Sequence, residues 1–257
     1  MRIAFDLHGI QSDGSRSRGI GRYSLEIIRN IIKYFPNHEF ILIANAALTD
    51  LKKELNDYLD YKNVSYVKWY APCPLDFVTG NQKRREIAKL LKSYTFGAIH
   101  VDKVIITSFF EGYSDNCLVD FDLEFLSIPI LSIFYDLIPL INHDLYLKNN
   151  PDFKKFYLSR LNQLEKLDGL LAISQSSAQE AGEYLTISKE KIFNISSGYN
   201  PKLFNKDVDI TDHITINANQ FSPFILYSGA IDPRKNVKTL IEAFSKLPIQ
   251  LNEYKLV

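Results

Sequence analysis

Two hydrophobic patterns alternate along the chain. Short runs of apolar residues predict strands, whereas longer segments in which apolar residues recur every three to four positions predict amphipathic helices. The predicted helices begin near 19 and 174 and cover 50–58, 82–94, 151–167 and 237–247. This alternation predicts an α/β fold with a doubly wound parallel sheet, which binds ligands at the carboxyl ends of its strands. The predicted strands are 2–5, 39–44, 64–70, 98–106, 128–134, 169–173, 192–195, 224–227 and one that starts at 254.

The alternation is interrupted by a polar segment, 204–222, that has no periodicity. We interpret this segment as a linker between an N-terminal Rossmann-like domain, 1–203, and a second domain, 223–257. The chain stops at Val257, after the first strand, the first helix and the start of another strand of that second domain. We therefore expect the second domain to be incomplete, because the chain is either a fragment of a longer protein or a truncated gene product.

The composition is typical of a globular protein, with 46% hydrophobic and 13% aromatic residues. The 30 basic and 30 acidic side chains leave no net charge, which argues against a nucleic-acid-binding protein. The 2 cysteines are too few for a disulfide framework or a zinc cluster, and a cytoplasmic location fits. The 5 histidines show no ligand spacing, so we predict no metal site. His8, directly after the first strand, either faces a ligand cleft or is a loop histidine without a role.

Neither a leader nor a membrane span is predicted. The first residues read as a strand and not as a signal peptide, because their apolar run is far too short. The longest apolar region, 125–141, is interrupted by two prolines and an aspartate, so it predicts a core segment. A basic cluster, 83–85, either contacts anionic lipid at the inner face of a membrane or is a solvated helix start. One short cluster attracts a membrane only weakly, which favours the second interpretation.

The second predicted domain opens with a strand, a glycine, a basic pair and a helix. Arg234 and Lys235 lie just before the helix, for which Asn236 is the expected N-cap. Cations are unfavourable at a helix N-terminus unless an anion lies between them and the helix. Backbone N–H groups, the helix dipole and two cations at one place predict a phosphate site. The alternative is a pair of solvated charges in a surface loop.

This segment resembles the start of the donor-binding domain of family 4 glycosyltransferases, which have the GT-B fold of two Rossmann-like domains. The resemblance implies that Arg234 and Lys235 hold the diphosphate of a sugar nucleotide, and that Gly229 lets the backbone come close to it. It extends over nearly the whole chain. Complete family members carry a pair of donor-binding glutamates further on, and this chain has no residues after Val257 to supply them.

Two phosphate motifs can be tested in the long loop that follows the first strand. Gly14 and Gly19 have the glycine spacing of a P-loop, but Ile20 and Gly21 stand where that motif requires Lys and Ser or Thr. A dinucleotide-binding fingerprint requires a third glycine where Ser24 stands. Both motifs are therefore excluded.

The family resemblance assigns this loop another role. It implies that Gly19, Gly21 and, in a later turn, Gly198 approach the sugar donor, with Arg22 on the acceptor side. It also places 172–174 at the end of the N-terminal domain near the interdomain cleft. For the residues 19–22, a flexible surface loop followed by a glycine-opened helix is an equally good interpretation.

Two further segments, each after a predicted strand, resemble a mannosyltransferase-like branch of the family. The segment 107–112 looks like the Ser-x-x-Glu-Gly turn of that branch, which implies a catalytic role for Glu111. The alternative is a loop that caps a following helix. Tyr135 and Asp136 stand where many members have His-Asp, so no catalytic histidine is expected there and Tyr135 is placed on the acceptor side. Asp136 either orients an acceptor hydroxyl, pairs with an arginine or anchors its loop, because a carboxylate after a central strand is costly to bury without a partner.

The resemblance implies a retaining glycosyltransferase that moves a sugar from a nucleotide diphosphate to a hydroxyl of a saccharide or lipid-linked acceptor. The branch-like motifs favour mannose, GDP-mannose over UDP-sugars, and cell-surface polysaccharide synthesis. Arg234, Lys235 and helix N-termini would stabilise the leaving diphosphate, so no metal is required. The Asp-x-Asp triplets at 120–122 and 207–209 are expected by chance and carry no prediction. The alternative hypothesis is a catalytically inactive module that binds an acceptor or a partner protein.

Overall fold

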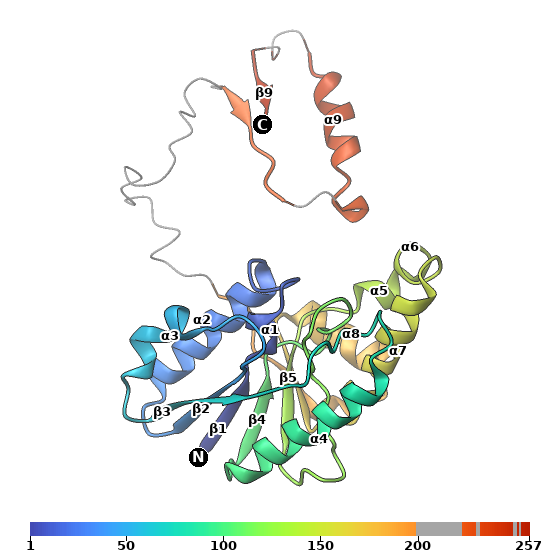
Figure 1. Cartoon of the computed structure of the whole chain (residues 1–257). Helices are drawn as coiled ribbons and strands as arrows, with labels where there is room; N and C mark the ends of the chain where they lie inside the picture. Colours follow the sequence, from blue (N-terminus) through green and yellow to red (C-terminus); the bar gives the residue numbers. More distant parts are fainter. Residues whose placement is uncertain (199–222, 230–231, 249–250, 252) are drawn as a thin grey trace. The chain divides into compact units, whose positions relative to one another are not determined.

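The computed structural model describes residues 1–198, 223–229, 232–248, 251 and 253–257. The chain divides into two compact units, Met1–Gly198 and Tyr199–Val257 (Figure 1). The first unit therefore ends five residues before the predicted boundary at 203. The predicted linker 204–222 lies outside the described residues, and so does the second Asp-x-Asp triplet.

The first unit is built on a seven-stranded sheet with the order β3-β2-β1-β4-β5-β6-β7. Every neighbouring pair of strands in this sheet is parallel. The chain moves outward from β1 to β3, returns, and then moves outward in the other direction from β4. This order confirms the predicted doubly wound fold and places its switch point between β1 and β4. The strands are β1 (Arg2–Asp6), β2 (Glu39–Asn45), β3 (Val64–Trp69), β4 (Lys103–Ile106), β5 (Ile130–Phe134), β6 (Gly169–Ala172) and β7 (Ile192–Asn194).

Helices cover both faces of this sheet. The two faces follow from the alternation of side chains along each strand: Ile3 and Phe5 of β1 belong to one hydrophobic cluster, and Ala4 belongs to the other. The first cluster includes Ile28 of α2 and Leu55 of α3, and the second includes residues of α4, α7 and α8. The helices are α1 (His8–Gln11), α2 (Gly19–Tyr34), α3 (Lys52–Leu59), α4 (Gln82–Ala98), α5 (Ile138–Ile141), α6 (His143–Tyr146), α7 (Pro151–Leu164) and α8 (Gln175–Tyr184), with a 3₁₀ turn η1 (Lys189–Lys191).

Capping residues explain where two of these helices begin. The carbonyl oxygen of the Asn150 side chain accepts a hydrogen bond from the amide of Phe153 at 3.0 Å, and Pro151 occupies the first turn of α7. The Ser174 hydroxyl accepts from the amide of Ser177 at 3.0 Å and caps α8, which agrees with the predicted helix start near 174.

The sequence prediction was wrong at several boundaries. The predicted strand 98–106 begins only at Lys103, because α4 continues to Ala98 and buries Phe96 against Phe121, with ring centroids 4.8 Å apart. The predicted loop 8–18 contains the short helix α1, and the helices α5 and α6 were not predicted. These helices have a single turn, which is too short for apolar residues to recur at helical spacing.

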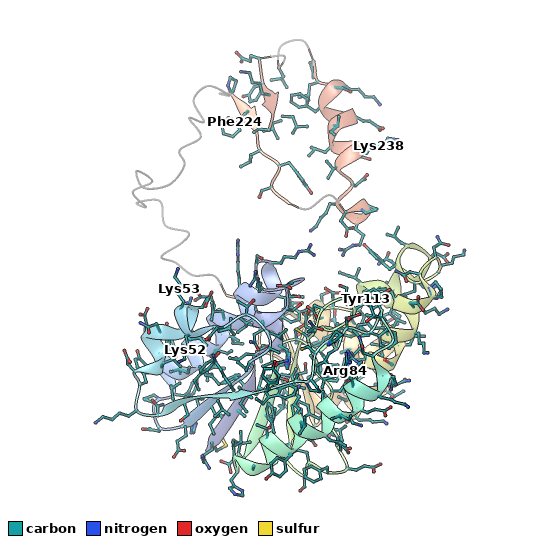
Figure 2. All side chains as sticks on the ribbon, viewed as in Figure 1. Lys52, Lys53, Arg84, Tyr113, Phe224 and Lys238 are labelled. Carbon is teal, nitrogen blue, oxygen red and sulfur yellow. The ribbon has the colours of Figure 1, made fainter. Side chains whose placement is uncertain are left out.

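The second unit contains β8 (Phe224–Ile225), η3 (Pro233–Lys235), α9 (Val237–Ser245) and β9 (Lys255–Leu256). The two strands pair in parallel, as a β-α-β start of a Rossmann-like domain requires. The predicted strand 224–227 is formed only in part, as β8, and its apolar residues are accessible: Phe224, labelled in Figure 2, is 37% exposed and Leu226 is 64% exposed. One described helix cannot cover both faces of even a two-stranded sheet, so its apolar residues stay accessible.

Among the described residues, no helix is long and apolar enough to cross a membrane.

Candidate functional site

The switch point between β1 and β4 is the place where a doubly wound sheet forms a crevice for ligands. Three segments meet there: the loop 7–18 with the start of α2, the turn 107–112 after β4, and Tyr135 with Asp136 after β5. Hydrogen bonds between these segments, described below, connect positions about a hundred residues apart in sequence. We refer to this region as the carboxyl-edge site.

A buried ionic group lies beneath the carboxyl-edge site. Asp6, the last residue of β1, is fully buried, and its two carboxylate oxygens lie 2.5 Å from His8 Nδ1 and 2.5 Å from Lys92 Nζ of α4. Lys92 also donates to the carbonyl oxygen of Leu118 at 2.7 Å. His8 is not a loop histidine without a role, as one of the two interpretations had it. Its Nδ1 carries the proton that an ionised Asp6 accepts, and its Nε2 has no hydrogen-bond partner among the described residues.

The charge state of Asp6 follows from these neighbours. Burial alone raises the pKa of the Asp6 carboxyl, but His8 and Lys92 outweigh it and lower the pKa from 3.8 to about 2. Asp6 is therefore ionised at neutral pH although it is inaccessible to water. A buried carboxylate in this state depends on Lys92, because losing that cation leaves an uncompensated charge. His8 adds a hydrogen bond to the other oxygen.

Thr107 joins the first loop to the end of β4. Its hydroxyl donates to the carbonyl oxygen of Asp6 at 2.7 Å and accepts from the amide of Gly9 at 3.1 Å. The Ser24 hydroxyl of α2 donates to the Thr107 carbonyl at 3.1 Å. The start of α2 is thus fixed on the ends of both β1 and β4.

Glu111 closes the loop from the other side. One of its carboxylate oxygens accepts from the Ser15 hydroxyl at 2.7 Å and from the Ser108 hydroxyl at 2.7 Å, and the residue is 7% exposed. The alternative interpretation of this turn, a cap on a following helix, was wrong, because the chain from 113 to β5 is irregular. The observed function of Glu111 in the fold is to hold the loop at Ser15.

Tyr135 points inward. Its hydroxyl lies 2.8 Å from the Ser24 hydroxyl and 3.2 Å from the Thr107 carbonyl oxygen, and burial raises the pKa of the phenol above its usual value. Its ring packs edge-on against Tyr23, with centroids 5.9 Å apart. Asp136, next to it, accepts from the amide of Ile138 at 3.1 Å. Of the three alternatives for Asp136, this hydrogen bond agrees with the loop anchor.

The N-terminus of α2 carries positive charge without acidic compensation. Its first turn has no acidic residue, and Arg18, in the N-cap position, makes no side-chain cap. Arg22 is exposed and has no ion-pair partner among the described residues. A Cβ added to Gly21 would lie 2.4 Å from the carbonyl oxygen of Arg16, whereas one added to Gly19 would meet nothing within 4 Å. Gly21 is therefore required by packing, and only Gly19 leaves open space at this helix end.

In the second unit, Asp232 supplies an anion that the sequence argument overlooked. Arg234 donates to Asp232 through Nε at 3.0 Å and through Nη2 at 3.1 Å. The premise that the basic pair needs an outside anion is therefore wrong for Arg234. Lys235 is exposed and has no ion-pair partner among the residues that the structure describes.

The expected N-cap Asn236 occupies the predicted position with a different geometry. It has a left-handed backbone with φ of 50° and makes no side-chain cap. Its side-chain oxygen instead accepts from the Thr239 hydroxyl at 2.7 Å. Gly229, in the loop before it, and Gly198, at the end of the first unit, are both exposed.

The buried residues that support the carboxyl-edge site, Asp6 and Lys92, are absent from the residues predicted from the sequence. One indication of them was available. Lys92 lies on the same face of α4 as the buried Ala88 and Phe96, at spacings of four residues. A lysine in the apolar stripe of an amphipathic helix predicts a buried partner, because such a charge is rarely buried without one.

Comparison with known proteins finds sequence similarity to glycosyltransferases. No family model matches it. It is 33% identical over 261 residues to the serotype-specific mannosyltransferase WbdA of Escherichia coli, a match that covers 98% of this chain and 31% of that protein. The chain is a homologue of glycosyltransferases. A second WbdA protein of the same species is 31% identical over 88% of this chain.

The chain thus spans about a third of the length of these curated relatives. The relationship confirms the resemblance seen in the sequence, and the doubly wound first unit followed by a β-α-β start agrees with the GT-B type. Among solved structures, a Rickettsia africae glycosyltransferase matches with a TM-score of 0.46 and 20% identity over 95% of this chain and 56% of its own. The Arabidopsis thaliana protein UGT89C1, solved with UDP, matches with a TM-score of 0.49 and 7% identity over 76% of this chain and 48% of its own.

The two glycines of α2 provide a matched test of the geometry at this helix end. Gly21→Ala should destabilise the protein by about 1–3 kcal/mol, because the new methyl group overlaps the backbone at Arg16. Gly19→Ala should change stability by less than about 0.5 kcal/mol, because its methyl group enters open space. Urea unfolding of both variants measures the difference. Equal stabilities would show that the loop does not pack on α2 as described.

The Asp6 carboxylate predicts a specific acid sensitivity. Because its folded pKa lies below the unfolded value of 3.8, it stabilises the fold above pH 4, and this contribution is lost as the pH falls towards 2. The shift corresponds to about 2 kcal/mol. A double variant, Asp6→Asn with Lys92→Met, removes both charges. Between pH 5 and pH 2 its free energy of unfolding should fall by about 2 kcal/mol less than that of the unmodified protein. Identical pH profiles in urea unfolding would contradict the assignment.

Proposed function

We propose that this chain is part of a retaining mannosyltransferase that uses a nucleotide-diphosphate sugar, GDP-mannose rather than a UDP-sugar. The acceptor is a hydroxyl of a saccharide or of a lipid-linked saccharide, in cell-surface polysaccharide synthesis. The observation that carries the proposal is the 33% identity to a protein named as a mannosyltransferase, which extends over nearly the whole chain. The doubly wound sheet supports it, because its open carboxyl edge suits a polar ligand.

In this proposal, the second unit binds the donor diphosphate. Arg234 and Lys235 stand immediately before α9, a helix of nine residues. The backbone N–H groups in the first turn of a helix have no acceptor within the helix and can bind an anion. The contacts from Asp232 hold the Arg234 guanidinium close to the helix start. Lys235, exposed beside it, supplies a cation for the phosphates. Gly229 gives the donor a close approach to the backbone.

The first unit binds the rest of the donor and the acceptor. Gly19 offers open space at the N-terminus of α2, and Arg22 supplies a cation there. Gly198, at the end of the first unit, is a further glycine that we assign to the donor. Tyr135 acts on the acceptor side by fixing the start of α2, since its own hydroxyl is already hydrogen-bonded.

Two carboxylates have proposed catalytic roles. Asp136 is half-buried and spends one oxygen on the Ile138 amide, which leaves the other for an acceptor hydroxyl. Glu111 has one oxygen bound by two serines, and we assign to its second oxygen a contact with the transferred sugar. The charge that develops on the leaving diphosphate would be stabilised by Arg234, Lys235 and helix N-termini, so the reaction should proceed without a metal.

Nucleotide binding tests this proposal. GDP-mannose at about 100 times its dissociation constant should stabilise the protein by about 2.7 kcal/mol and raise its melting temperature by several degrees. UDP-glucose and UDP-N-acetylglucosamine should give smaller shifts. The double variant Arg234→Ala with Lys235→Ala should lose the response. Lys238→Ala, which removes a highly exposed cation from the same helix, should keep it.

Two outcomes would contradict the proposal at different levels. If no nucleotide shifts the melting temperature, either of this chain or of a longer protein that contains it, the chain is an inactive binding module. If the Arg234 and Lys235 variant responds like the unmodified protein, these two residues do not belong to the donor site.

A further inference from the structure

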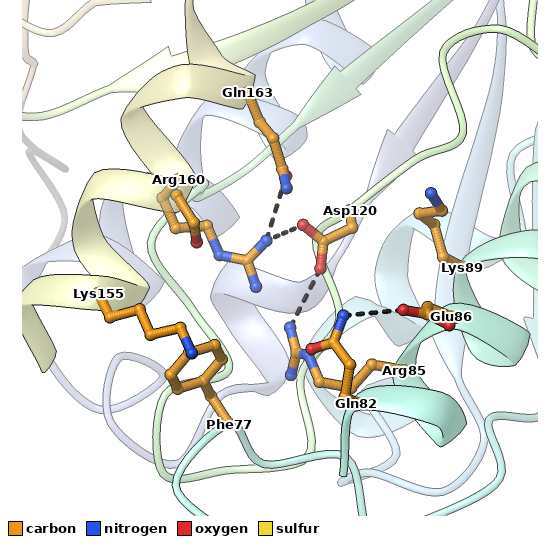
Figure 3. A pocket seen from close by; sticks show the side chains of 10 residues that line it. Phe77, Gln82, Arg85, Glu86, Lys89, Asp120, Lys155, Arg160 and Gln163 are labelled. Carbon is orange, nitrogen blue, oxygen red and sulfur yellow. Dashed lines mark hydrogen bonds and ion pairs between the residues drawn. The ribbon is translucent and has the colours of Figure 1, made fainter. Parts of the chain in front are cut away.

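A polar pocket lies in the first unit, between α4 and α7. Figure 3 shows the side chains that line it, and its volume is about 340 Å³, which is within the range of small-molecule sites. None of these residues belongs to the carboxyl-edge site or to the proposed donor site. The lining residues are Phe77, Gln82, Arg85, Glu86, Lys89, Asp120, Lys155, Ser159, Arg160 and Gln163.

The inner wall of this pocket holds two arginines and one aspartate, all buried. Arg85 Nη2 lies 3.1 Å from one carboxylate oxygen of Asp120, and Arg160 Nη1 donates to the other. Burial opposes ionisation of Asp120, but Arg160 and Arg85 outweigh it and lower its pKa below the usual value. The group therefore carries two positive charges and one negative charge in a place with little solvent. The prediction that the basic cluster 83–85 is solvated was wrong for Arg85, which belongs to this group.

Arg160 has hydrogen-bonding capacity that its neighbours do not use. It is 1% exposed, and its Nε and Nη2 atoms have no hydrogen-bond partner among the described residues. Only Nη1 is engaged, by Asp120 and, at 3.4 Å, by the side-chain oxygen of Gln163. The ring of Phe156 lies under the guanidinium at 4.8 Å and holds its plane. In Figure 3 the guanidinium group is directed into the pocket.

The rim adds further positive charge. Lys155, one turn before Ser159 and Arg160 on α7, is exposed and has no ion-pair partner among the described residues. Lys89 on α4 lies 3.8 Å from Asp122, outside the lining. Glu86 is the only other carboxylate of the lining, and it accepts from the Gln82 amide at 2.9 Å. With Asp122 counted beside Lys89, four cations and three carboxylates leave this pocket with a surplus of one positive charge.

We propose that this pocket binds a small organic phosphate. The guanidinium edge formed by Nε and Nη2, which are buried and unpartnered among the described residues, has the spacing of two oxygens of one phosphate group, and Lys155 contributes a third, charged contact. A phosphate monoester carries about two negative charges at neutral pH and is therefore attracted by the two arginines more strongly than a carboxylate, which carries one. The pocket volume of about 340 Å³ exceeds that of a phosphate group alone, so a further polar group can be accommodated. This inference does not depend on the proposed function.

Isothermal titration calorimetry with glucose 6-phosphate, inorganic phosphate and acetate, at constant ionic strength, tests the proposal. Both phosphates should bind, glucose 6-phosphate more tightly, and acetate should not. Lys155→Glu and Arg160→Lys should each weaken phosphate binding about tenfold or more. Arg160→Lys keeps the positive charge that Asp120 requires but lacks the two-nitrogen edge of the guanidinium group. If it fails to fold, the exposed position 155 decides the test alone.

Matched variants separate this pocket from other cations. Lys154→Glu makes the same charge change one residue earlier on α7, outside the lining, and should leave binding unchanged. Lys235→Ala should also leave it unchanged, which distinguishes this pocket from the proposed donor site. The proposal is overturned if neither phosphate binds, if Lys155→Glu binds as tightly as the unmodified protein, or if Lys235→Ala abolishes binding. Acetate binding as tight as phosphate would overturn the assignment of a phosphate.

Discussion

The buried ion pair between Asp6 and Lys92 is the constraint on which the first unit depends. Asp6 ends the central strand β1, and Lys92 reaches it from α4, so the pair connects the sheet to the helix that covers it. Lys92 also binds the Leu118 carbonyl and lies 4.1 Å from the centre of the Phe121 ring. Removing two charges from water is costly, and only close pairing with further hydrogen bonds offsets that cost. The positions of β1, α4 and the segment 118–121 are therefore coupled.

The carboxyl-edge site is built outward from this pair. The Asp6 backbone accepts from Thr107, Thr107 accepts from Ser24, and Ser24 meets the Tyr135 hydroxyl. Glu111 closes the opposite side by binding Ser15. A long loop that the sequence describes only as rich in glycine, serine and arginine is thereby fixed against the ends of β1 and β4. In the proposed function, this fixation presents the start of α2 to the sugar donor at little entropic cost.

The fold was predictable from the sequence because alternating strands and helices leave a pattern in every ten to twenty residues. The order of the elements and the start of a helix near 174 follow from such local information. Partners distant in sequence leave no such pattern: Lys92 is 86 residues from Asp6, and Arg160 is 40 residues from Asp120. The partner of Arg234 could have been found from the sequence, since Asp232 is only two residues away, but the prediction of a phosphate site considered only the cations. The apolar run 224–227 is accessible although it predicts a strand, because a strand pattern shows which residues are apolar and not whether another layer covers them.

The coupling energy between Asp6 and Lys92 tests the central claim most directly. It is obtained from urea unfolding of Asp6→Asn, Lys92→Met and the double variant. Each single variant should lose about 3–5 kcal/mol, because it leaves one buried charge unpaired. The double variant should be more stable than the sum of the two losses implies, by about 2 kcal/mol or more. Losses that add within about 0.5 kcal/mol would show that the two residues act independently, and would contradict the account.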